Sequence, residues 1–512
     1  MFACLYAPDF PVQAVVRARP EYHPISLNRT PVVVLDGSAA TQRVFALNQP
    51  ARQQGARAGM TKVELDACEQ MVVCKRSTAL EKSAQAALLD CAHCFSPRVE
   101  AVADGIVVAD VSGTERLFGP AQKLTRAISI QGNKFGFELN IGITANPDTA
   151  VHVARGYPGN TVVEPGEEAA RLACLPIDVL PATSEMLQIL DAWGIRNCQA
   201  LAALPSLALV ERIGQAGLHL QQLARGKINR TLVPVEPALE FIESFEFDDP
   251  VGTLDGISFI LNRLIQQLCA RLSGRSLAAS ELKLTLAFDV RDVNSGKRGD
   301  VYERTWKLPV ATQNAKTIFK LIHLDLEGVS QAAPVQAITM EAVPTKKRFT
   351  QHSFFIPAGP APEELEITLK RIRGLVGERD QNGVERVGSP MILDSHKPDS
   401  FAVSSASIDS IPSQYRKSRS APCIALRIYR PAFSATVEVS NDRPVAVSFS
   451  KKHLRVVAAS GPWRSSGHWW SDSQAWTRDE WDIALRTKEG IGLYRIYFDL
   501  IQEKWFVEGM FD

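Results

Sequence analysis

The stretch VEAVADGIVVADVSGTERLFG, residues 99–119, decides the fold of this chain. Its apolar run predicts a strand over Ile106–Val111. The chain opens on a similar apolar segment, MFACLYA. Further strands are expected near 32–35, 137–143 and 161–163, and helices near 78–95, 121–131 and 148–155. This alternation predicts an α+β domain.

These two strands resemble the palm of the Y-family (translesion) DNA polymerases. In that family the second strand runs hydrophobic, Ser-hydrophobic-Asp-Glu, two apolar residues, Asp and a further apolar residue. On this pattern Asp110 matches the last Asp, whereas Gly105 and Ile106 stand where the Asp–Glu pair belongs. In the first strand Ala7 takes the place of the first metal-binding Asp, and Asp9 remains.

The resemblance implies that the catalytic site has been lost. Nucleotidyl transfer in this family needs two Mg²⁺ ions held by carboxylates, because hard cations require oxygen ligands. Ala7, Gly105 and Ile106 offer no side-chain oxygen, so we expect no catalysis, no bound metal and no cofactor. The alternative is an active polymerase in which Asp104, one residue early, supplies a missing acid. A one-residue slip turns a strand side chain to the other face, so this alternative requires a β-bulge.

Three further positions agree with a lost nucleotide site. The family's nucleotide-clamping Tyr and Arg lie in a block that here is FALNQPAR, residues 45–52, where Arg52 is kept and Gln49 replaces Tyr. The family's Lys that touches the triphosphate aligns with Tyr157. Its aromatic steric gate aligns with Val12, and a protein that binds no nucleotide has no need of that gate.

Composition bounds the remaining possibilities. The 512 residues suffice for three to five domains, with 45% hydrophobic and 22% charged residues, as in an ordinary soluble protein. The net charge of +1 gives no support for nucleic-acid binding, so any DNA contact must come from local basic patches. There is no signal peptide or apolar span, so we expect a cytoplasmic protein that does not enter a membrane. Nine scattered cysteines suit a reducing compartment, and Cys91 and Cys94 lie at core positions of a helical pattern.

The predicted fold class is multidomain α+β, similar to the palm, fingers, thumb and little finger of Y-family polymerases, followed by a Trp-rich, β-rich module. The expected parts are 1–165, palm-like with a fingers insertion at about 11–75; 166–233, a thumb-like helical domain; 236–348, a little-finger-like domain; 349–423, a linker with one helix at 362–376; and 424–512, the C-terminal module.

Two regions are predicted to contact DNA. Gly214 and Gly217 lie between helices of the thumb-like domain, where exposed backbone N–H groups and helix N-termini attract phosphate. The alternative there is a plain helical bundle with glycine caps. Lys346, Lys347 and Arg348 close the little-finger-like domain and offer sequence-independent, salt-sensitive phosphate contacts. Other candidate cations in that domain are Arg271, Arg275, Lys283, Arg304 and Lys307, for each of which a solvated surface role is the alternative.

The segment that follows is QHSFF, residues 351–355, and it resembles the bacterial sliding-clamp-binding peptide Gln-x-Ser/Asp-Leu-Phe. The resemblance implies that the Gln351 amide anchors one end, that Ser353 takes the Ser/Asp position, and that Phe354 and Phe355 fill an apolar pocket of the β clamp. We therefore expect the sliding clamp to be a partner.

Six of the eight tryptophans fall between Trp463 and Trp505. The run GPWRSSGHWW, residues 461–470, and the segment RDEWD, residues 478–482, closely resemble the C-terminal signature of the ImuB subfamily. Trp beside Arg is typical of protein-binding hot spots and also of base stacking. The predicted protein-binding residues are Trp463, Arg464, Trp469, Trp470 and Trp481; the alternative, that the tryptophans form the core of a small β domain, is expected for about half of them.

ImuB proteins are the non-catalytic members of the Y family that belong to the bacterial mutagenesis cassette. The resemblance covers nearly the whole chain and implies a DNA- and clamp-bound scaffold in damage-induced mutagenesis and translesion synthesis. Its implied partners are an error-prone C-family DNA polymerase and an ImuA/RecA-like protein. Two alternatives stay open: an active translesion polymerase, and a clamp-bound regulator that does not touch DNA.

Overall fold

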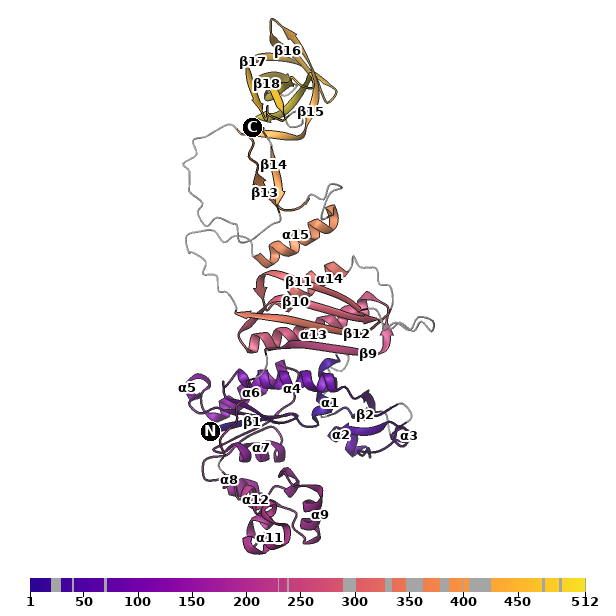
Figure 1. Cartoon of the computed structure of the whole chain (residues 1–512), viewed down its shortest axis with the longest axis vertical. Coiled ribbons are helices and arrows are strands. Elements are labelled where there is room, and N and C mark those ends of the chain that lie inside the picture. The colour runs from indigo at the N-terminus through magenta and orange to yellow at the C-terminus, as the bar shows by residue number, and fades with distance from the viewer. Residues whose placement is uncertain are drawn as a thin grey trace. The chain divides into compact units, whose positions relative to one another are not determined.

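The computed structural model describes residues 1–512 except 20–28, 39–40, 69–70, 229, 237–238, 289–300, 327–333, 347–361, 378–385, 399, 405–424, 472–474, 488–489 and 512. The chain forms two compact units, residues 1–367 and 368–512. Both α/β and all-β parts are present (Figure 1), which confirms the predicted class of a mixed α/β protein with a β-rich C-terminal region.

The centre of the first unit is a five-stranded sheet in the order β5-β6-β1-β7-β8. Its register places Tyr6 opposite Ile106 and Phe2 opposite Asp110, so the two strands that the sequence singled out lie side by side. The helices α4 and α6 cover one face, and α7 covers the other (Figure 1). The elements are β1 (Phe2–Tyr6), α4 (Thr78–His93), β5 (Val99–Ala103), β6 (Ile106–Asp110), α5 (Glu115–Phe118), α6 (Ala121–Lys134), β7 (Asn140–Thr144), α7 (Pro147–Gly156) and β8 (Asn160–Val162).

The alternation of side chains along β1 explains the two covered faces. Leu5 and Ala7 pack with α4 and α6, whereas Cys4 packs with α7. Cys91 of α4 is fully buried in the same core, and Cys94 donates weakly to the carbonyls of Asp90 and Gly274, so the core interpretation of this pair is confirmed.

A smaller three-stranded sheet, in the order β3-β2-β4, lies between β1 and α4 in the sequence. The helices α2 and α3 of this region begin at side-chain caps: Asn48 accepts from the amide of Ala51, and Thr61 forms a capping box with Glu64. The elements are α1 (Phe10–Ala18), β2 (Val32–Asp36), β3 (Arg43–Leu47), α2 (Gln49–Gln53), α3 (Lys62–Leu65) and β4 (Val72–Lys75).

The helical region after the palm packs around its own apolar core, which includes Leu172, Leu190, Leu201 and Leu220. The hydroxyl of Tyr157 donates to the carbonyl of Arg171 and ties this region to the end of α7. The elements are α8 (Glu168–Ala173), a 3-10 turn (Ile177–Val179), α9 (Ser184–Ala192), α10 (Cys198–Ala203), α11 (Ser206–Ile213) and α12 (Gln215–Ala224).

A four-stranded antiparallel sheet, β11-β10-β12-β9, carries two helices on one face. Three of its strands and both helices follow the predicted pattern, but β9 does not, because charged residues hide its alternation. The elements are β9 (Phe241–Val251), α13 (Leu254–Gly274), β10 (Leu277–Phe288), β11 (Val301–Thr312), α14 (Ala315–Leu326) and β12 (Val335–Lys346).

The second unit contains a closed barrel of six antiparallel strands. The expected linker also contains a two-stranded hairpin, which the sequence did not predict. The elements are α15 (Pro362–Val376), β13 (Ser389–Ile392), β14 (Phe401–Ser404), β15 (Leu426–Ser440), β16 (Arg443–Phe449), β17 (Lys452–Gly467), β18 (Trp476–Thr487), β19 (Gly490–Asp499) and β20 (Lys504–Phe511). In the described part of the chain, every helix is too short or too polar to cross a membrane.

Candidate functional site

A cavity of about 860 Å³ lies where the C-terminal end of β1, the start of β6 and the small three-stranded sheet meet. The lining from the palm-like sheet includes Ala7, Asp104 and Ile106. The structure therefore brings together the positions that the alignment with the family had singled out. Phe45 and Arg52 line it from the fingers-like region.

Gly105 closes the turn between β5 and β6 in a conformation that only glycine adopts easily. Its φ is +73°, and a Cβ at this position would lie 2.7 Å from the Cβ of Phe10. Its carbonyl accepts from the amide of Ala7 at 2.9 Å, and its own N–H donates to Gln85 Oε1 at 2.8 Å. The turn is therefore fixed by hydrogen bonds on both sides and packed against an aromatic ring.

The three carboxylates that could have formed a metal site are not gathered together: Asp9 and Asp104 line the cavity, and Asp110 does not. Asp9 is held by Arg52, with Nη2 to Oδ1 at 2.6 Å. Asp110 lies at the far end of β6, opposite Phe2, where Arg98 pairs with it at 2.9 Å. Burial acts to raise the pKa of Asp110, but hydrogen bonds from residue 112 and the charge of Arg98 hold it below its usual value.

Asp104 is the one acid among these three that faces the cavity without a recorded ion pair, and its side chain is exposed. Within the described ranges, no group of three or more His, Cys, Asp or Glu residues is placed to hold a metal ion. The alternative in which Asp104 completes a carboxylate cluster therefore lacks its other members.

Arginines, rather than acids, dominate the polar lining. Arg57 and Arg155 join Arg52 at the cavity, and the guanidinium of Arg76 stacks 3.7 Å above the ring of Phe45. Sequence reasoning missed Arg155, because α7 contributes it from a position outside the family motifs. It placed Phe45 in the nucleotide-clamping block but assigned it no role at the site. The lining also holds the aromatic residues Tyr6 and Phe10 and two acids, Asp9 and Asp104. Since Asp9 is paired with Arg52, this lining holds one unpaired carboxylate and offers few oxygen ligands to Mg²⁺.

The two predicted glycine contacts play different parts. Gly214 has φ +83° and separates α11 from α12, whose N-terminus has no side-chain cap, so the first amides of α12 are open to a phosphate. Gly217 is buried inside α12, where a Cβ would lie 2.9 Å from that of Ile213. Gly217 therefore allows close packing and does not itself contact DNA, which corrects that part of the prediction.

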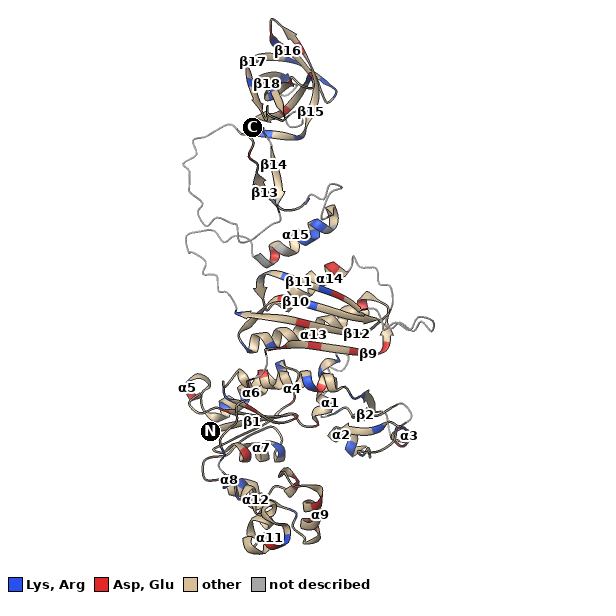
Figure 2. Cartoon of the chain, in the orientation of Figure 1, with Lys and Arg blue, Asp and Glu red and all other residues tan. Residues whose placement is uncertain are grey.

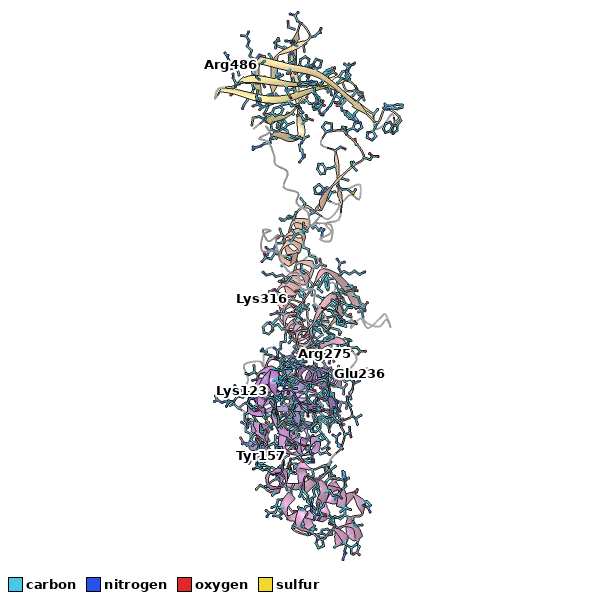
Figure 3. The ribbon with its side chains drawn as sticks, turned by 90° about the vertical axis from the view of Figure 1, so that its left-hand side faces the viewer. Lys123, Tyr157, Glu236, Arg275, Lys316 and Arg486 are labelled. Carbon is cyan, nitrogen blue, oxygen red and sulfur yellow. The ribbon has the colours of Figure 1, made fainter. Side chains whose placement is uncertain are left out.

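Several predicted phosphate contacts of the little-finger-like domain are already paired. The Arg271 side chain is 3% exposed and ion-paired with Glu243 and Asp90, so its prediction as a DNA contact is wrong. Arg275, labelled in Figure 3, has Nη1 4.0 Å from Asp90. The exposed pairs in the same domain are Lys283 with Glu303 at 3.0 Å and Arg304 with Asp325 at 3.3 Å.

The outer face of the same sheet is not predominantly basic. Register places Glu281 opposite Lys307, and Lys283 opposite both Thr305 and Glu341. Blue and red residues are interspersed over these strands (Figure 2). Lys346 is exposed at the end of β12, whereas Lys347, Arg348 and the whole clamp-like segment 351–355 lie outside the described residues.

The barrel separates the C-terminal tryptophans into two groups. Trp469 and Trp470 are 80% and 67% exposed in the turn after β17, and Trp463 is 48% exposed. Trp481 is 5% exposed and packs inside the barrel, so its prediction as a partner contact is wrong. Arg464 is exposed and forms a bidentate pair with Asp479, with both contacts at 2.7 Å.

Comparisons with known proteins find sequence similarity over most of the chain. Residues 5–154 match the impB/mucB/samB family. Protein ImuB of Caulobacter vibrioides is 22% identical over 457 residues, which cover 86% of this chain and 96% of that protein. DNA polymerase IV of the same species is 24% identical over 305 residues, 58% of this chain and 72% of that one.

Among solved structures, DinB from Sulfolobus solfataricus aligns with a TM-score of 0.39 and 16% identity, over 68% of this chain and all of that chain. The chain is thus similar to the impB/mucB/samB family over residues 5–154, and to Protein ImuB over most of its length.

Proposed function

We propose that this protein is a non-catalytic Y-family polymerase homologue that serves as a DNA- and sliding-clamp-bound scaffold in damage-induced mutagenesis and translesion synthesis. The observation that carries the proposal is the cavity at the end of β1, where Ala7 and Ile106 stand at the positions expected for metal-binding acids. Gly105, between them, is fixed in a turn that leaves no room for a side chain.

The chemistry of nucleotidyl transfer explains why we expect no catalysis at this cavity. Two Mg²⁺ ions stabilise the attacking and leaving oxygens, and carboxylates must converge to hold them. Asp9 is engaged by Arg52, and Asp110 lies at the other end of its strand. The remaining acid, Asp104, cannot hold two metals alone.

The DNA contact in this proposal is carried by backbone amides and a few free cations. The open N-terminus of α12 beyond Gly214 suits a phosphate, and Lys346 is exposed. Such contacts are independent of base sequence. The similarity to a DNA polymerase IV supports the same assignment.

The protein contacts rest on the sequence resemblance together with exposure. We assign the clamp to Gln351, Ser353, Phe354 and Phe355. We assign the C-family polymerase or the ImuA/RecA-like partner to the surface around Trp469 and Trp470, whose exposed rings lie 5.6 Å apart. Large exposed aromatic rings are typical hot-spot residues of protein interfaces.

The test is primer extension by the purified full-length chain on primed and lesion-containing templates, with Mg²⁺ or Mn²⁺. We expect no incorporation, with a DNA polymerase IV as positive control on the same templates. The second candidate, an active translesion polymerase, is favoured by the position of Asp104 at the cavity. Template-dependent incorporation that Asp104→Ala abolishes would establish it and refute the scaffold proposal.

A further inference from the structure

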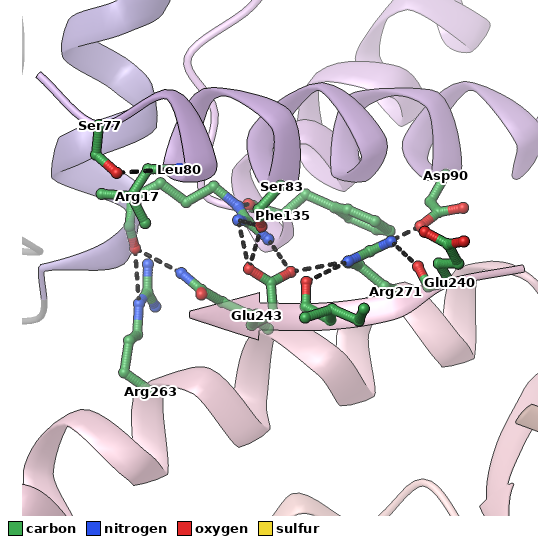
Figure 4. Close-up of polar contacts among 12 residues, drawn as sticks. Arg17, Ser77, Leu80, Ser83, Asp90, Phe135, Glu240, Glu243, Arg263 and Arg271 are labelled. Atoms are coloured by element: carbon green, nitrogen blue, oxygen red, sulfur yellow. Dashed lines mark hydrogen bonds and ion pairs between the residues drawn. The ribbon is translucent and has the colours of Figure 1, made fainter. Parts of the chain in front are cut away.

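The little-finger-like domain packs on the helical layer of the palm through a buried polar network (Figure 4). Its members come from α1 and α4 on the palm side and from β9 and α13 on the other side. Arg17 and Glu243 are 226 residues apart in sequence, yet their side chains are 3% and 2% exposed and ion-paired at 3.1 Å. The network is therefore a contact between domains.

Glu243 is the centre of the network. Arg17 donates from Nη1 to Oε2 and from Nη2 to Oε1, each at 3.1 Å. Arg271 donates from Nη1 to Oε1 at 3.2 Å, and the hydroxyl of Ser83 donates to Oε2. One buried carboxylate thus accepts from two helices of the palm side and from one helix of its own domain.

Each arginine is also held at its other nitrogens. Arg17 donates from Nε to the carbonyl of Phe135 at 2.9 Å. Arg271 donates from Nε to Asp90 Oδ2 at 2.8 Å and from Nη2 to the carbonyl of Glu240 at 2.8 Å. The guanidinium groups of Arg17 and Arg271 balance the carboxylates of Glu243 and Asp90 in charge. Two further arginines lie beside this group: Arg263 donates to the carbonyl of Arg17, and Arg275 lies 4.0 Å from Asp90.

The electrostatics distinguish the two acids. Burial acts to raise the pKa of Glu243, but Arg17 and Arg271 outweigh it and hold the pKa below its usual value. At Asp90, burial raises the pKa, and Arg271 offsets this only in part. Glu243 is therefore the firmly ionised member, and its removal leaves two buried cations facing each other.

Secondary contacts surround this centre. The carbonyl of Arg17 accepts from Arg263 Nε at 3.1 Å and from the amide of Gln267. Arg19 pairs with Asp248 at 2.7 Å. At the C-terminal end of α13, Gly274 approaches Cys94 so closely that a Cβ would lie 2.9 Å from its Sγ.

We propose that Glu243, Arg17 and Arg271 form an interdomain lock that fixes the little-finger-like domain on the palm, so that this part of the chain meets DNA as a preassembled body. A small shift of the little-finger-like domain would break these hydrogen bonds while the charges are still shielded from water. Partly detached positions of that domain are therefore disfavoured. The consequence for DNA rests on the proposed function. The interdomain lock is independent of the proposed function.

Gly274→Cys tests the lock without breaking it. Its Cβ would stand 2.9 Å from the Cys94 Sγ, near the separation of about 3 Å that a disulfide requires between these atoms. The Phe135 ring, at the same distance, must turn aside. The full-length variant is oxidised with diamide, and the crosslink is measured by mass spectrometry. Cys94→Ala in the same background is the control.

We expect rapid, complete crosslinking, and the crosslinked and reduced proteins should bind duplex DNA with affinities within about twofold of each other. A loss of more than about tenfold on crosslinking, restored by reductant, would show that the domain must leave the palm to bind DNA, and would overturn the proposal. If the reduced protein binds no DNA, the proposed function fails, and the lock is judged by amide hydrogen exchange.

In that second measurement Glu243→Gln should speed exchange in α4, β9 and α13 together, because the lost charge frees both domains. Glu303→Gln, which breaks the exposed pair with Lys283, is the matched control and should leave those elements unchanged. Equal protection in the two variants would overturn the lock. The rate of the crosslink to Cys94 is also measured for Gly274→Cys combined with Glu243→Gln. The lock requires this rate to be lower in the combined variant than in Gly274→Cys alone.

Discussion

Gly105→Ala should destabilise the palm-like domain far more than Gly113→Ala, although both glycines have nearly the same backbone conformation. Their φ values are +73° and +78°, so an alanine pays a similar cost at each, roughly 1–2 kcal/mol. The added methyl group meets nothing within 4 Å at Gly113. At Gly105 it lies 2.7 Å from Phe10 Cβ and 2.9 Å from Cγ.

The difference between the variants isolates this contact. Phe10 is 6% exposed and packed in the palm core, so it has little room to move. Overpacking of this kind costs about 1–3 kcal/mol, which brings the expected loss for Gly105→Ala to roughly 2–5 kcal/mol. Gly113→Ala should stay near roughly 1–2 kcal/mol.

Native-state amide hydrogen exchange of peptides covering β1 and β6 is the appropriate assay, because a chain with several domains does not unfold in a single two-state step. Equal protection in the two variants would refute the argument that Phe10 closes the turn at Gly105. Larger side chains should be tolerated still less. Restoring acids at positions 7, 105 and 106 together should therefore not restore primer extension.

Replacing residues 346–348 with alanine should lower the slope of log K for DNA against log salt by up to about 0.9 per lost phosphate contact. The triple variant Gln351→Ala, Phe354→Ala, Phe355→Ala should weaken clamp binding well over about tenfold, since truncating a hot-spot residue costs at least ~2 kcal/mol, although not additively. Burial lowers the pKa of His152 to about 4, so the stability contributed by its neutral form is complete above about pH 6.5 and is lost as the pH falls toward about 4. His152→Gln should flatten this acid-side loss, as measured by hydrogen exchange in α7.

Each of these measurements has a matched control in the chain. Lys283→Ala removes a cation already paired with Glu303, and it should leave the salt slope unchanged. A salt slope near zero in the unaltered protein would favour a regulator that does not touch DNA. His352→Ala changes the position at which the clamp peptide accepts any residue, and Phe354→Leu should bind as well or better.

For the titration, His219→Gln changes an exposed histidine and should leave the pH dependence as it is. Unchanged clamp affinity in the triple variant would show that the motif is a chance match. If His152→Gln loses stability at acid pH as the unaltered protein does, the loss comes from other groups. His93, whose pKa burial lowers to about 4, is the next histidine to replace.

The alternating apolar patterns predicted four of the five strands of the palm-like sheet and most strands of the little-finger-like sheet, because burial leaves a local pattern in the sequence; they missed β5. The strand β9 escaped prediction because Glu243 occupies an inward position, which is stable only with Arg17 and Arg271 beside it. Those partners come from distant parts of the chain. Local periodicity cannot indicate a buried charge whose compensation is tertiary.

The barrel illustrates a second limit. The long strand β17, which the sequence did not predict, continues through Gly461 and Pro462 with an irregular register between Ser460 and Trp463. Trp481, between Glu480 and Asp482, pairs with Ile496 and faces inward, whereas Trp469 is exposed in the turn after β17. Strand register, which is set when the barrel closes, decides which aromatic side chains are available to a partner.

The geometry around Glu243 also constrains how sequences related to this one can diverge. A neutral residue at position 243 leaves the guanidinium groups of Arg17 and Arg271 without the carboxylate that separates them. A lineage that loses Glu243 is thus under selection to replace Arg17 and Arg271 as well. A lineage that loses the arginines first leaves Glu243 buried without a partner, which is equally unfavourable. Substitutions at positions 17, 243 and 271 should accordingly be inherited as a set, whatever happens to the surrounding surface.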